Sequence, residues 1–190
     1  MNLKTYLFSL RYFILFSSLV FILAVFNGYF IARNLPVQTK EILESFREFL
    51  EPINKMNPFQ QLLIVFLNNS LTTFSALLFG TIFGIFPLLC LLANGGILGA
   101  LAFLSSQNLS LSVFLTGILP HGIIEISVLI LSCSSGIKIG KEVITRIVKR
   151  RGRVKEELLL SFDFFLRVLL PFLFLAAMIE VFIVPHILFK

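Results

Sequence analysis

Residues 59–104 read FQQLLIVFLNNSLTTFSALLFGTIFGIFPLLCLLANGGILGALAFL, 46 residues without one charged side chain. As a single α-helix this run would be about 69 Å long, more than twice the ~30 Å hydrocarbon core of a bilayer. It therefore crosses a membrane twice or re-enters it. Gly84 to Pro87 suits a tight turn between two spans, whereas Asn94 to Gly96 suits an unwound point inside the membrane. The sequence leaves open which of them is the turn.

The composition of the whole chain is that of a membrane protein. Of its 190 residues, 57% are hydrophobic and only 14% are charged, a ratio with too little polar surface for a soluble domain. We therefore predict an all-α fold, a transmembrane helical bundle that forms a single membrane domain over residues 1–190. About five segments are long and apolar enough to span a bilayer: residues 12–32, 60–83, 86–104, 111–137 and 164–189.

Two polar connections join these spans. Residues 39–51 repeat apolar side chains at helical spacing, which predicts a short amphipathic helix on the membrane surface. Residues 138–162 form the second connection, with eight Lys or Arg between Lys138 and Lys155. Since basic connections favour the cytoplasm, we expect a cytoplasmic amino terminus in the cell membrane, with the amphipathic helix and the carboxyl terminus outside. We expect the basic connection to contact anionic lipid head groups rather than nucleic acid.

The stretch LPHGIIE, residues 119–125, places ionisable side chains within a span. His121 and Glu125 are four residues apart and share one face of a helix. Ionisable groups at membrane depth usually face a protein interior or a wet cavity. Pro120 predicts a kink and Gly122 permits close approach of another backbone.

Two asparagines are expected at about the same depth as His121 and Glu125. A count of 1.5 Å per residue from the span ends places Asn68 and Asn94 in the middle third of the bilayer. The sequence thus predicts a midplane polar site made of Asn68, Asn94, Gly95, Pro120, His121, Gly122 and Glu125.

Glycines four residues apart predict close contacts between helices. Three such pairs occur: Gly80 with Gly84, Gly95 with Gly99, and Gly136 with Gly140. The pattern fits contacts within the chain and also a dimer face, so a homo-oligomer stays open.

A metal site has some support in the sequence. The two histidines of the chain and the two glutamates embedded in spans are His121, His186, Glu125 and Glu180, and such ligands could bind zinc. However, the motif lacks the HExxH spacing, and counting along the spans places Glu180 several Å nearer the outer surface than Glu125. No phosphate-binding loop or nucleophile elbow is present. We therefore predict no cofactor, no resident metal and no catalytic residue, and nothing in the sequence requires an enzyme.

Residues 68–140, roughly 40% of the chain, resemble the stage II sporulation protein M family. The resemblance rests on a series of elements in a fixed order: Asn68, Gly80 with Gly84 and Pro87, Asn94 with Gly95 and Gly99, LPHGxxE at residues 119–125, and Gly136 with Gly140. In the family a proline often follows the motif glutamate, whereas Ile126 and Ser127 follow here. The resemblance implies a multi-pass membrane protein. The namesake acts as a scaffold for peptidoglycan-degrading enzymes during engulfment in spore-forming bacteria.

Three functions follow from these observations. In a transport-type protein, the midplane site would bind a proton, an ion or a polar head group, and a broken helix at Asn94 to Gly96 would be typical. In a scaffold or assembly subunit of a cell-envelope complex, the polar residues would only fix helix packing. An intramembrane metal-dependent hydrolase ranks below both.

Overall fold

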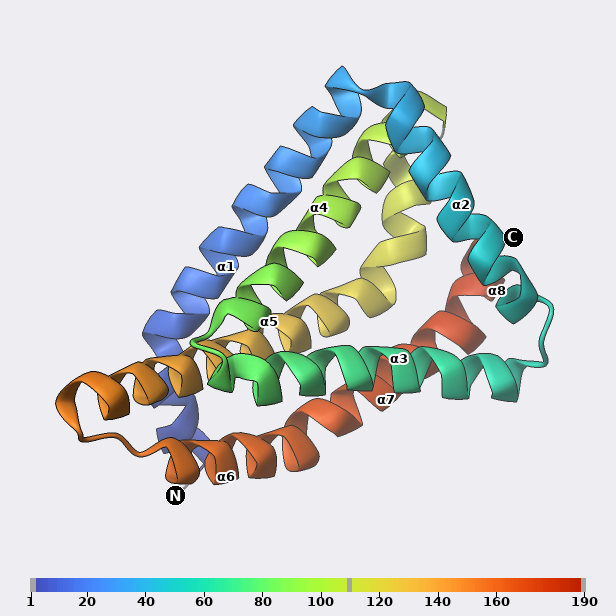
Figure 1. Ribbon diagram of the computed structural model, residues 1–190. Helices are drawn as coiled ribbons and strands as arrows, with labels where there is room; N and C mark the ends of the chain where they lie inside the picture. Colours follow the sequence, from blue (N-terminus) through green and yellow to red (C-terminus); the bar gives the residue numbers. More distant parts are fainter. Residues whose placement is uncertain (1–2, 109–110, 189–190) are drawn as a thin grey trace.

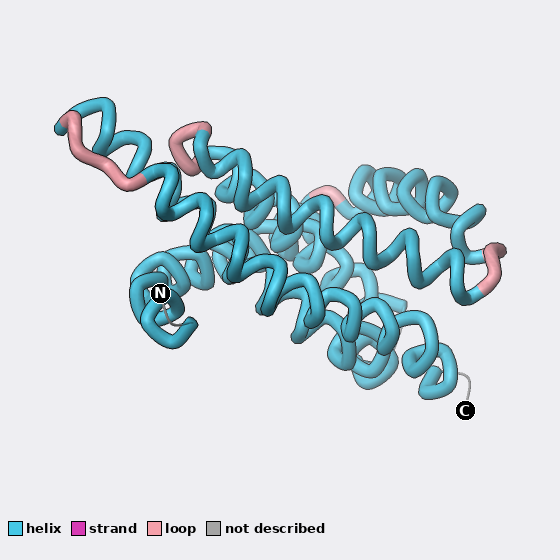
Figure 2. The backbone as a smooth tube through the Cα atoms, turned by 90° about the horizontal axis from the view of Figure 1, so that it is seen from below, coloured by secondary structure: helices cyan, strands magenta, loops and turns pink. Residues whose placement is uncertain are grey.

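The structure is a computed structural model that describes residues 3–108 and 111–188, and within these ranges the chain forms helices and short connections without a strand (Figure 2). Five helical segments are long and apolar enough to cross a membrane, which confirms the all-α prediction. They are Leu3–Asn34, Pro58–Thr81, Ile85–Gln107, Pro120–Lys149 and Val154–His186. The end of the last predicted span, residue 189, lies outside the described residues.

The elements follow one another as labelled in Figure 1. In chain order they are α1 (Leu3–Asn34), α2 (Pro36–Asn54), α3 (Pro58–Leu78), the 3-10 turn η1 (Phe79–Thr81), α4 (Ile85–Asn108), α5 (Leu111–Lys149), α6 (Val154–Phe164), the π-helical turn η2 (Phe165–Leu169), α7 (Leu170–Met178), the π-helical turn η3 (Ile179–Ile183) and α8 (Val184–Leu188). The elements from α6 to α8 continue one another as one long helix. Each of its π turns ends two residues before a proline, Pro171 or Pro185, which cannot donate the backbone hydrogen bond of a regular α-helix.

The turn between the second and third spans lies at Gly84. Phe83 and Gly84 both have positive φ, 53° and 73°, and α4 begins at the next residue. Asn94 to Gly96, by contrast, lie within an uninterrupted helix. The interpretation of Asn94 to Gly96 as an unwound point is therefore wrong. Gly95 and Gly96 instead allow a close contact between α4 and α1.

That contact brings the backbones of α1 and α4 together over much of their length (Figure 1). A Cβ atom built on Gly28 would lie 2.1 Å from the carbonyl oxygen of Gly96, and one on Gly99 would lie 2.0 Å from that of Val25. Helices in a membrane gain no hydrophobic free energy by associating, so close backbone contact of this kind is a main source of their stability.

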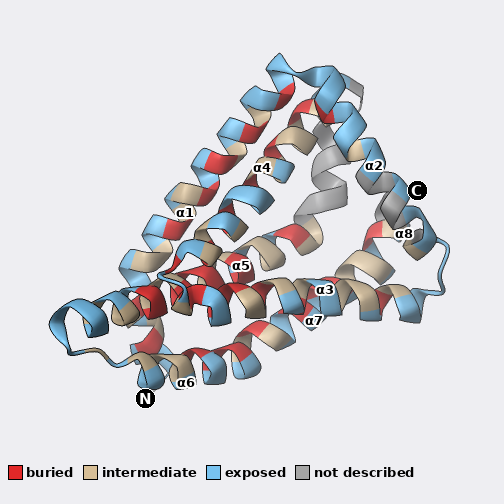
Figure 3. Cartoon of the chain, viewed as in Figure 1, coloured by how far each residue is buried: buried red, intermediate tan, exposed pale blue. Residues whose placement is uncertain are grey.

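Helix α5 is the central element of the bundle. Half of its apolar stretch is buried, against 22–28% in the other four spans, and Figure 3 shows the buried residues gathering along its inner part. A strip of small residues runs through it from Ser132 to Gly136. Ser132 Oγ donates to the carbonyl oxygen of Thr73 (2.5 Å), and a Cβ on Gly136 would lie 2.3 Å from the carbonyl oxygen of Ala76. The predicted glycine pairs thus make contacts within the chain.

The basic connection is shorter than residues 138–162, because α5 continues to Lys149 and α6 begins at Val154. The two helices form a hairpin with residues 150–153 at its tip (Figure 1). Lys138 Nζ lies 2.8 Å from Glu157 Oε2, and both side chains are largely buried. Lys138 therefore ties α6 to α5 instead of facing lipid head groups.

Helix α2 begins at Pro36, before the predicted boundary, and ends at Asn54 beyond Pro52. Most of its described side chains are exposed (Figure 3). It connects the end of α1 to the start of α3 along one side of the bundle (Figure 1).

We expect the substitution Gly99→Ala to destabilise the protein, since its methyl group would overlap the backbone of α1 and overpacking costs about 1–3 kcal/mol. The measurement is the fraction of protein that stays monodisperse after heating in detergent. Gly96→Ala is the matched control, because nothing lies within 4 Å of a Cβ at Gly96. Equal heat sensitivity of the two variants would contradict the packing described here.

Candidate intramembrane binding site

A cavity of ≈ 280 Å³ lies where α1, α3, α4, α5 and α7 approach one another. Its polar lining comes from three helices: Asn69, Thr72 and Thr73 of α3, Asn94 of α4, and His121 and Glu125 of α5. The rest of the lining is apolar apart from the backbone of Gly122. Since a single buried water needs only about 10–15 Å³ of such space, the cavity has room for a hydrated ion or a small polar molecule.

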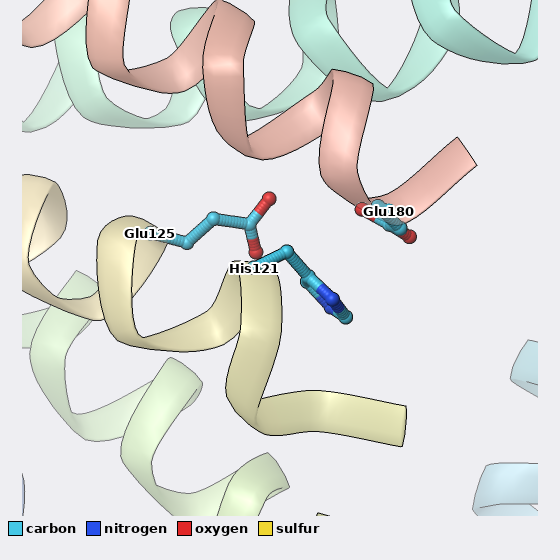
Figure 4. Close-up of side chains that lie close together, drawn as sticks. All are labelled: His121, Glu125 and Glu180. Carbon is cyan, nitrogen blue, oxygen red and sulfur yellow. The ribbon is translucent and has the colours of Figure 1, made fainter. Parts of the chain in front are cut away.

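Three ionisable side chains converge beside this cavity (Figure 4). His121, Glu125 and Glu180 each offer a ligand atom, and these atoms all lie within 4.8 Å of one another. All three residues are half-buried. The first two come from adjacent turns of α5, and Glu180 comes from the π turn η3 of the facing helix.

Glu180 is the group whose proximity to the motif the sequence did not predict. Counting along parallel spans put it several Å nearer the outer surface than Glu125. In the structure, α5 bends in its first third, which contains Pro120, and the last helix runs at an angle to it (Figure 1). A π turn also shifts the direction of the side chains that follow it. These departures from straight, parallel helices bring Glu180 to the motif.

Asn69 is the asparagine that reaches the motif. Its Nδ2 donates a hydrogen bond to Glu125 Oε1. Asn68, which the sequence assigned to the site, is exposed and does not line the cavity. Neighbouring residues of a helix point about 100° apart, so a count of depth could not choose between the two.

Two hydrogen bonds to backbone carbonyl groups hold the part of α3 that carries Asn69. Thr73 Oγ1 donates to the carbonyl oxygen of Asn69 (2.7 Å), and Ser132 of α5 donates to the carbonyl oxygen of Thr73 (2.5 Å). This arrangement connects the small-residue strip of α5 to the site. Neither threonine was expected in the site, because nothing in the sequence distinguishes Thr72 and Thr73 from other threonines in the spans.

The remaining predicted residues have different roles. Asn94 lines the cavity, while its Nδ2 donates to the carbonyl oxygen of Cys90 in its own helix (2.8 Å). Gly95 packs against α1, where a Cβ built on the glycine would lie 2.7 Å from the Cβ of Ala24. It does not line the cavity. Pro120 lies in the bent part of α5, and Gly122 is buried in the cavity wall.

The two histidines differ in their surroundings. His121 Nδ1 is buried and has no hydrogen-bond partner among the described residues. His186 is exposed, and its Nδ1 lies 2.8 Å from the carbonyl oxygen of Phe182. His186 therefore does not join the cluster, although the sequence offered it as a candidate ligand.

The cavity, the motif and the glycine contacts lie within one region of similarity to known proteins. A family model described as stage II sporulation protein M matches residues 17–185. The chain belongs to the stage II sporulation protein M family. As a member of this family it is a multi-pass membrane protein, and the match extends the resemblance from residues 68–140 to the helix that carries Glu180.

Comparison with other proteins adds a relative but no activity. An uncharacterized protein of Methanocaldococcus jannaschii is 33% identical over 124 residues, which cover 64% of this chain and 70% of the relative. No solved structure matches this stage II sporulation protein M family member. Its function therefore has to be argued from the site.

We expect Asn69→Ala to lower the thermal stability of the protein in detergent, because it removes the donor to Glu125. Hydrogen bonds between helices in membranes contribute about 0.6 kcal/mol on average and up to about 1.7 kcal/mol. Asn68→Ala is the matched control and should leave the melting curve unchanged. A coupling free energy close to zero in the double-mutant cycle of Asn69→Ala and Glu125→Gln would contradict the contact.

Proposed function

We propose that this protein is a transport-type membrane protein that binds a small cation, a proton or a metal ion, at His121, Glu125 and Glu180. The observation that carries the proposal is the convergence of two carboxylates and an imidazole beside a polar cavity within the transmembrane bundle. Ionisable side chains in membrane spans are costly and commonly mark ion pathways and proton relays.

The charges of the cluster favour a cation. Two carboxylates at this distance repel each other unless a proton or a cation lies between them. No Lys or Arg occurs among the described residues that line the cavity, so no permanently charged cation among them offsets the carboxylates. An anionic head group would add to the repulsion and is disfavoured.

The polar groups of the cluster are also incompletely satisfied by the protein itself. Asn69 supplies one hydrogen bond to Glu125, whereas His121 Nδ1 has no partner in the described part of the chain. A cluster that only fixes helix packing would be expected to satisfy its own buried polar atoms. This difference supports a binding role over a purely structural one.

Flux into proteoliposomes tests the proposal. We expect the reconstituted protein to move protons or Zn²⁺, followed with trapped pH-sensitive and zinc-sensitive dyes. His121→Ala and Glu125→Gln should reduce that flux to the level of protein-free liposomes. Glu41→Gln, on the exposed face of α2, controls for the loss of a carboxylate outside the cluster. The proposal would be contradicted if the flux of both ions in His121→Ala and Glu125→Gln equalled that of the wild type.

A scaffold function is the second candidate, and the α5–α6 hairpin favours it. Ile147 and Val148 are 63% and 72% exposed near its tip, next to the basic residues Lys149 to Arg151. Such a surface suits an anionic membrane surface or a partner subunit of a cell-envelope complex. Under this hypothesis, His121→Ala and Glu125→Gln lower thermal stability, and no flux depends on either residue.

The orientation that we propose places this hairpin in the cytoplasm, in keeping with the bias of basic residues towards that side. We expect a cysteine introduced by Arg151→Cys to resist a membrane-impermeant maleimide in intact cells and to react after permeabilisation. A cysteine introduced at Gln38 of α2, which is exposed, should react in intact cells. The reverse pattern would show that the orientation is inverted.

A further inference from the structure

We propose that His121, Glu125 and Glu180 together bind one divalent transition-metal ion of the zinc type within the membrane, through one imidazole nitrogen and two carboxylate oxygens. The inference deepens the proposed function and rests on it, since it names the cation. The prediction from sequence that no metal is resident rested on the missing HExxH spacing and on the different depth expected for Glu180. In the structure the ligand atoms of Glu180, His121 and Glu125 all lie within 4.8 Å of one another.

The spacing of the ligand atoms suits a metal ion. Zinc lies about 2.0–2.2 Å from nitrogen and oxygen ligands, so two ligands of a tetrahedral site are about 3.4 Å apart. The three atoms here lie within 4.8 Å of one another. A shift of about 1 Å by each side chain would close the difference, and rotation about the bonds of two glutamates can supply it.

The buried nitrogen of His121 independently indicates a ligand. Each ring nitrogen of an imidazole carries either a proton or a lone pair, so each needs a hydrogen-bond partner or a metal ion when it is buried. Leaving a buried polar atom unpaired costs about 1–3 kcal/mol, and such an atom in a native protein often marks a water or an ion. His121 Nδ1 is buried without a partner among the described residues, next to two carboxylates in Figure 4.

Asn69 gives Glu125 the support that metal-binding carboxylates usually have. Ligands in metal sites are held by hydrogen bonds from outer groups, which fix their orientation. Asn69 Nδ2 donates to Oε1 of Glu125, so that Oε2 is left for a ligand. The helix that holds Asn69 is itself anchored to α5 through Thr73 and Ser132.

Charge selects a divalent ion over a monovalent one. Two carboxylates carry a charge of −2, which a divalent cation neutralises, and a neutral assembly avoids the large cost of burying net charge. Binding a single proton leaves one negative charge in the apolar surroundings. A divalent cation is therefore the ligand that best matches the site.

The ligand types select among divalent ions. Mg²⁺ and Ca²⁺ prefer six or more oxygen ligands, whereas a mixed nitrogen and oxygen set with three protein ligands suits Zn²⁺, Mn²⁺ or Fe²⁺. Neither Cys90 nor Cys133 belongs to the cluster, which disfavours thiophilic Cu⁺. Three protein ligands leave a fourth position, as in zinc sites that exchange water or substrate.

Direct binding of Zn²⁺ to the full chain tests the inference. The protein is purified without a histidine tag, stripped with a chelator, and titrated with Zn²⁺ in nanodiscs against a competing fluorescent chelator. We expect one Zn²⁺ per chain. His121→Ala, Glu125→Gln and Glu180→Gln should each weaken the affinity at least about tenfold, the lower end of what loss of even an outer-sphere partner costs. His186→Ala, which removes the histidine outside the cluster, should bind as the wild type does.

The change in melting temperature on addition of Zn²⁺ provides a second measurement in case one variant folds poorly. A ligand that binds only the folded state raises its stability by RT ln(1 + [L]/Kd), so Zn²⁺ should raise the melting temperature of the wild type and of His186→Ala. The isosteric variant Glu180→Gln should remain monodisperse and show no such rise. The visible absorption bands of bound Co²⁺ should indicate a coordination number of four or five in the wild type. These bands should be absent in Glu180→Gln.

Absence of stoichiometric Zn²⁺ binding overturns the inference, and so does binding that is unchanged in all three cluster variants. If Zn²⁺ does not bind but proton flux depends on His121 and Glu125, the metal assignment fails and the transport proposal survives. If Zn²⁺ binds through the cluster but no flux occurs, the metal assignment is supported and the transport proposal fails.

Discussion

Contact between backbones across α5 is the constraint on which the rest of this structure depends. In a bilayer, apolar side chains are as well solvated by lipid as by protein, so helices associate through close packing and interhelical hydrogen bonds. Gly80 and Gly136 meet with almost no side-chain volume between them. Ser132 and Ser134 of the same strip pair with Thr73 and Ser17. This strip holds α5 at a fixed depth and rotation.

The site depends on that fixation. Glu125 and His121 lie two and three turns before the strip on the same helix, so their direction is set by contacts that involve no charged group. Because these contacts keep α5 from rotating, Glu125 cannot turn towards lipid, and a side chain that is costly at membrane depth can persist within a span. The contacts that stabilise the bundle and the proposed binding site thus lie in different parts of one helix.

The sequence was sufficient for the architecture and for two of the three members of the cluster, His121 and Glu125. Hydropathy identifies five spans because each is longer than the apolar core of a bilayer requires, and the spacing of His121 and Glu125 follows from helix geometry alone. The sequence could not choose Asn69 over Asn68, because depth and composition are the same for both and only helix rotation separates them. It could not bring Glu180 to the motif, since Pro120 predicts a kink but not its direction, and π turns are not visible in a count of residues. Asn94 to Gly96 were misread because glycines that break a helix and glycines that allow close packing look alike in one sequence.

The π turns of the last helix affect which insertions and deletions this chain can tolerate. A π turn is what one inserted residue leaves behind when a helix keeps its contacts on both sides. Between η2 and η3 the helix from Leu170 to Met178 thus has its own rotational setting, distinct from that of α6. Loss of a single residue within η2 would restore a regular α-helix while the residues on both sides kept their contacts, so Glu180 would stay beside the motif. Loss of one residue from α7, which carries no extra residue, would instead turn the residues after it by about 100° and direct Glu180 away from His121 and Glu125. For this helix, the position of a one-residue change in length decides whether the cluster survives.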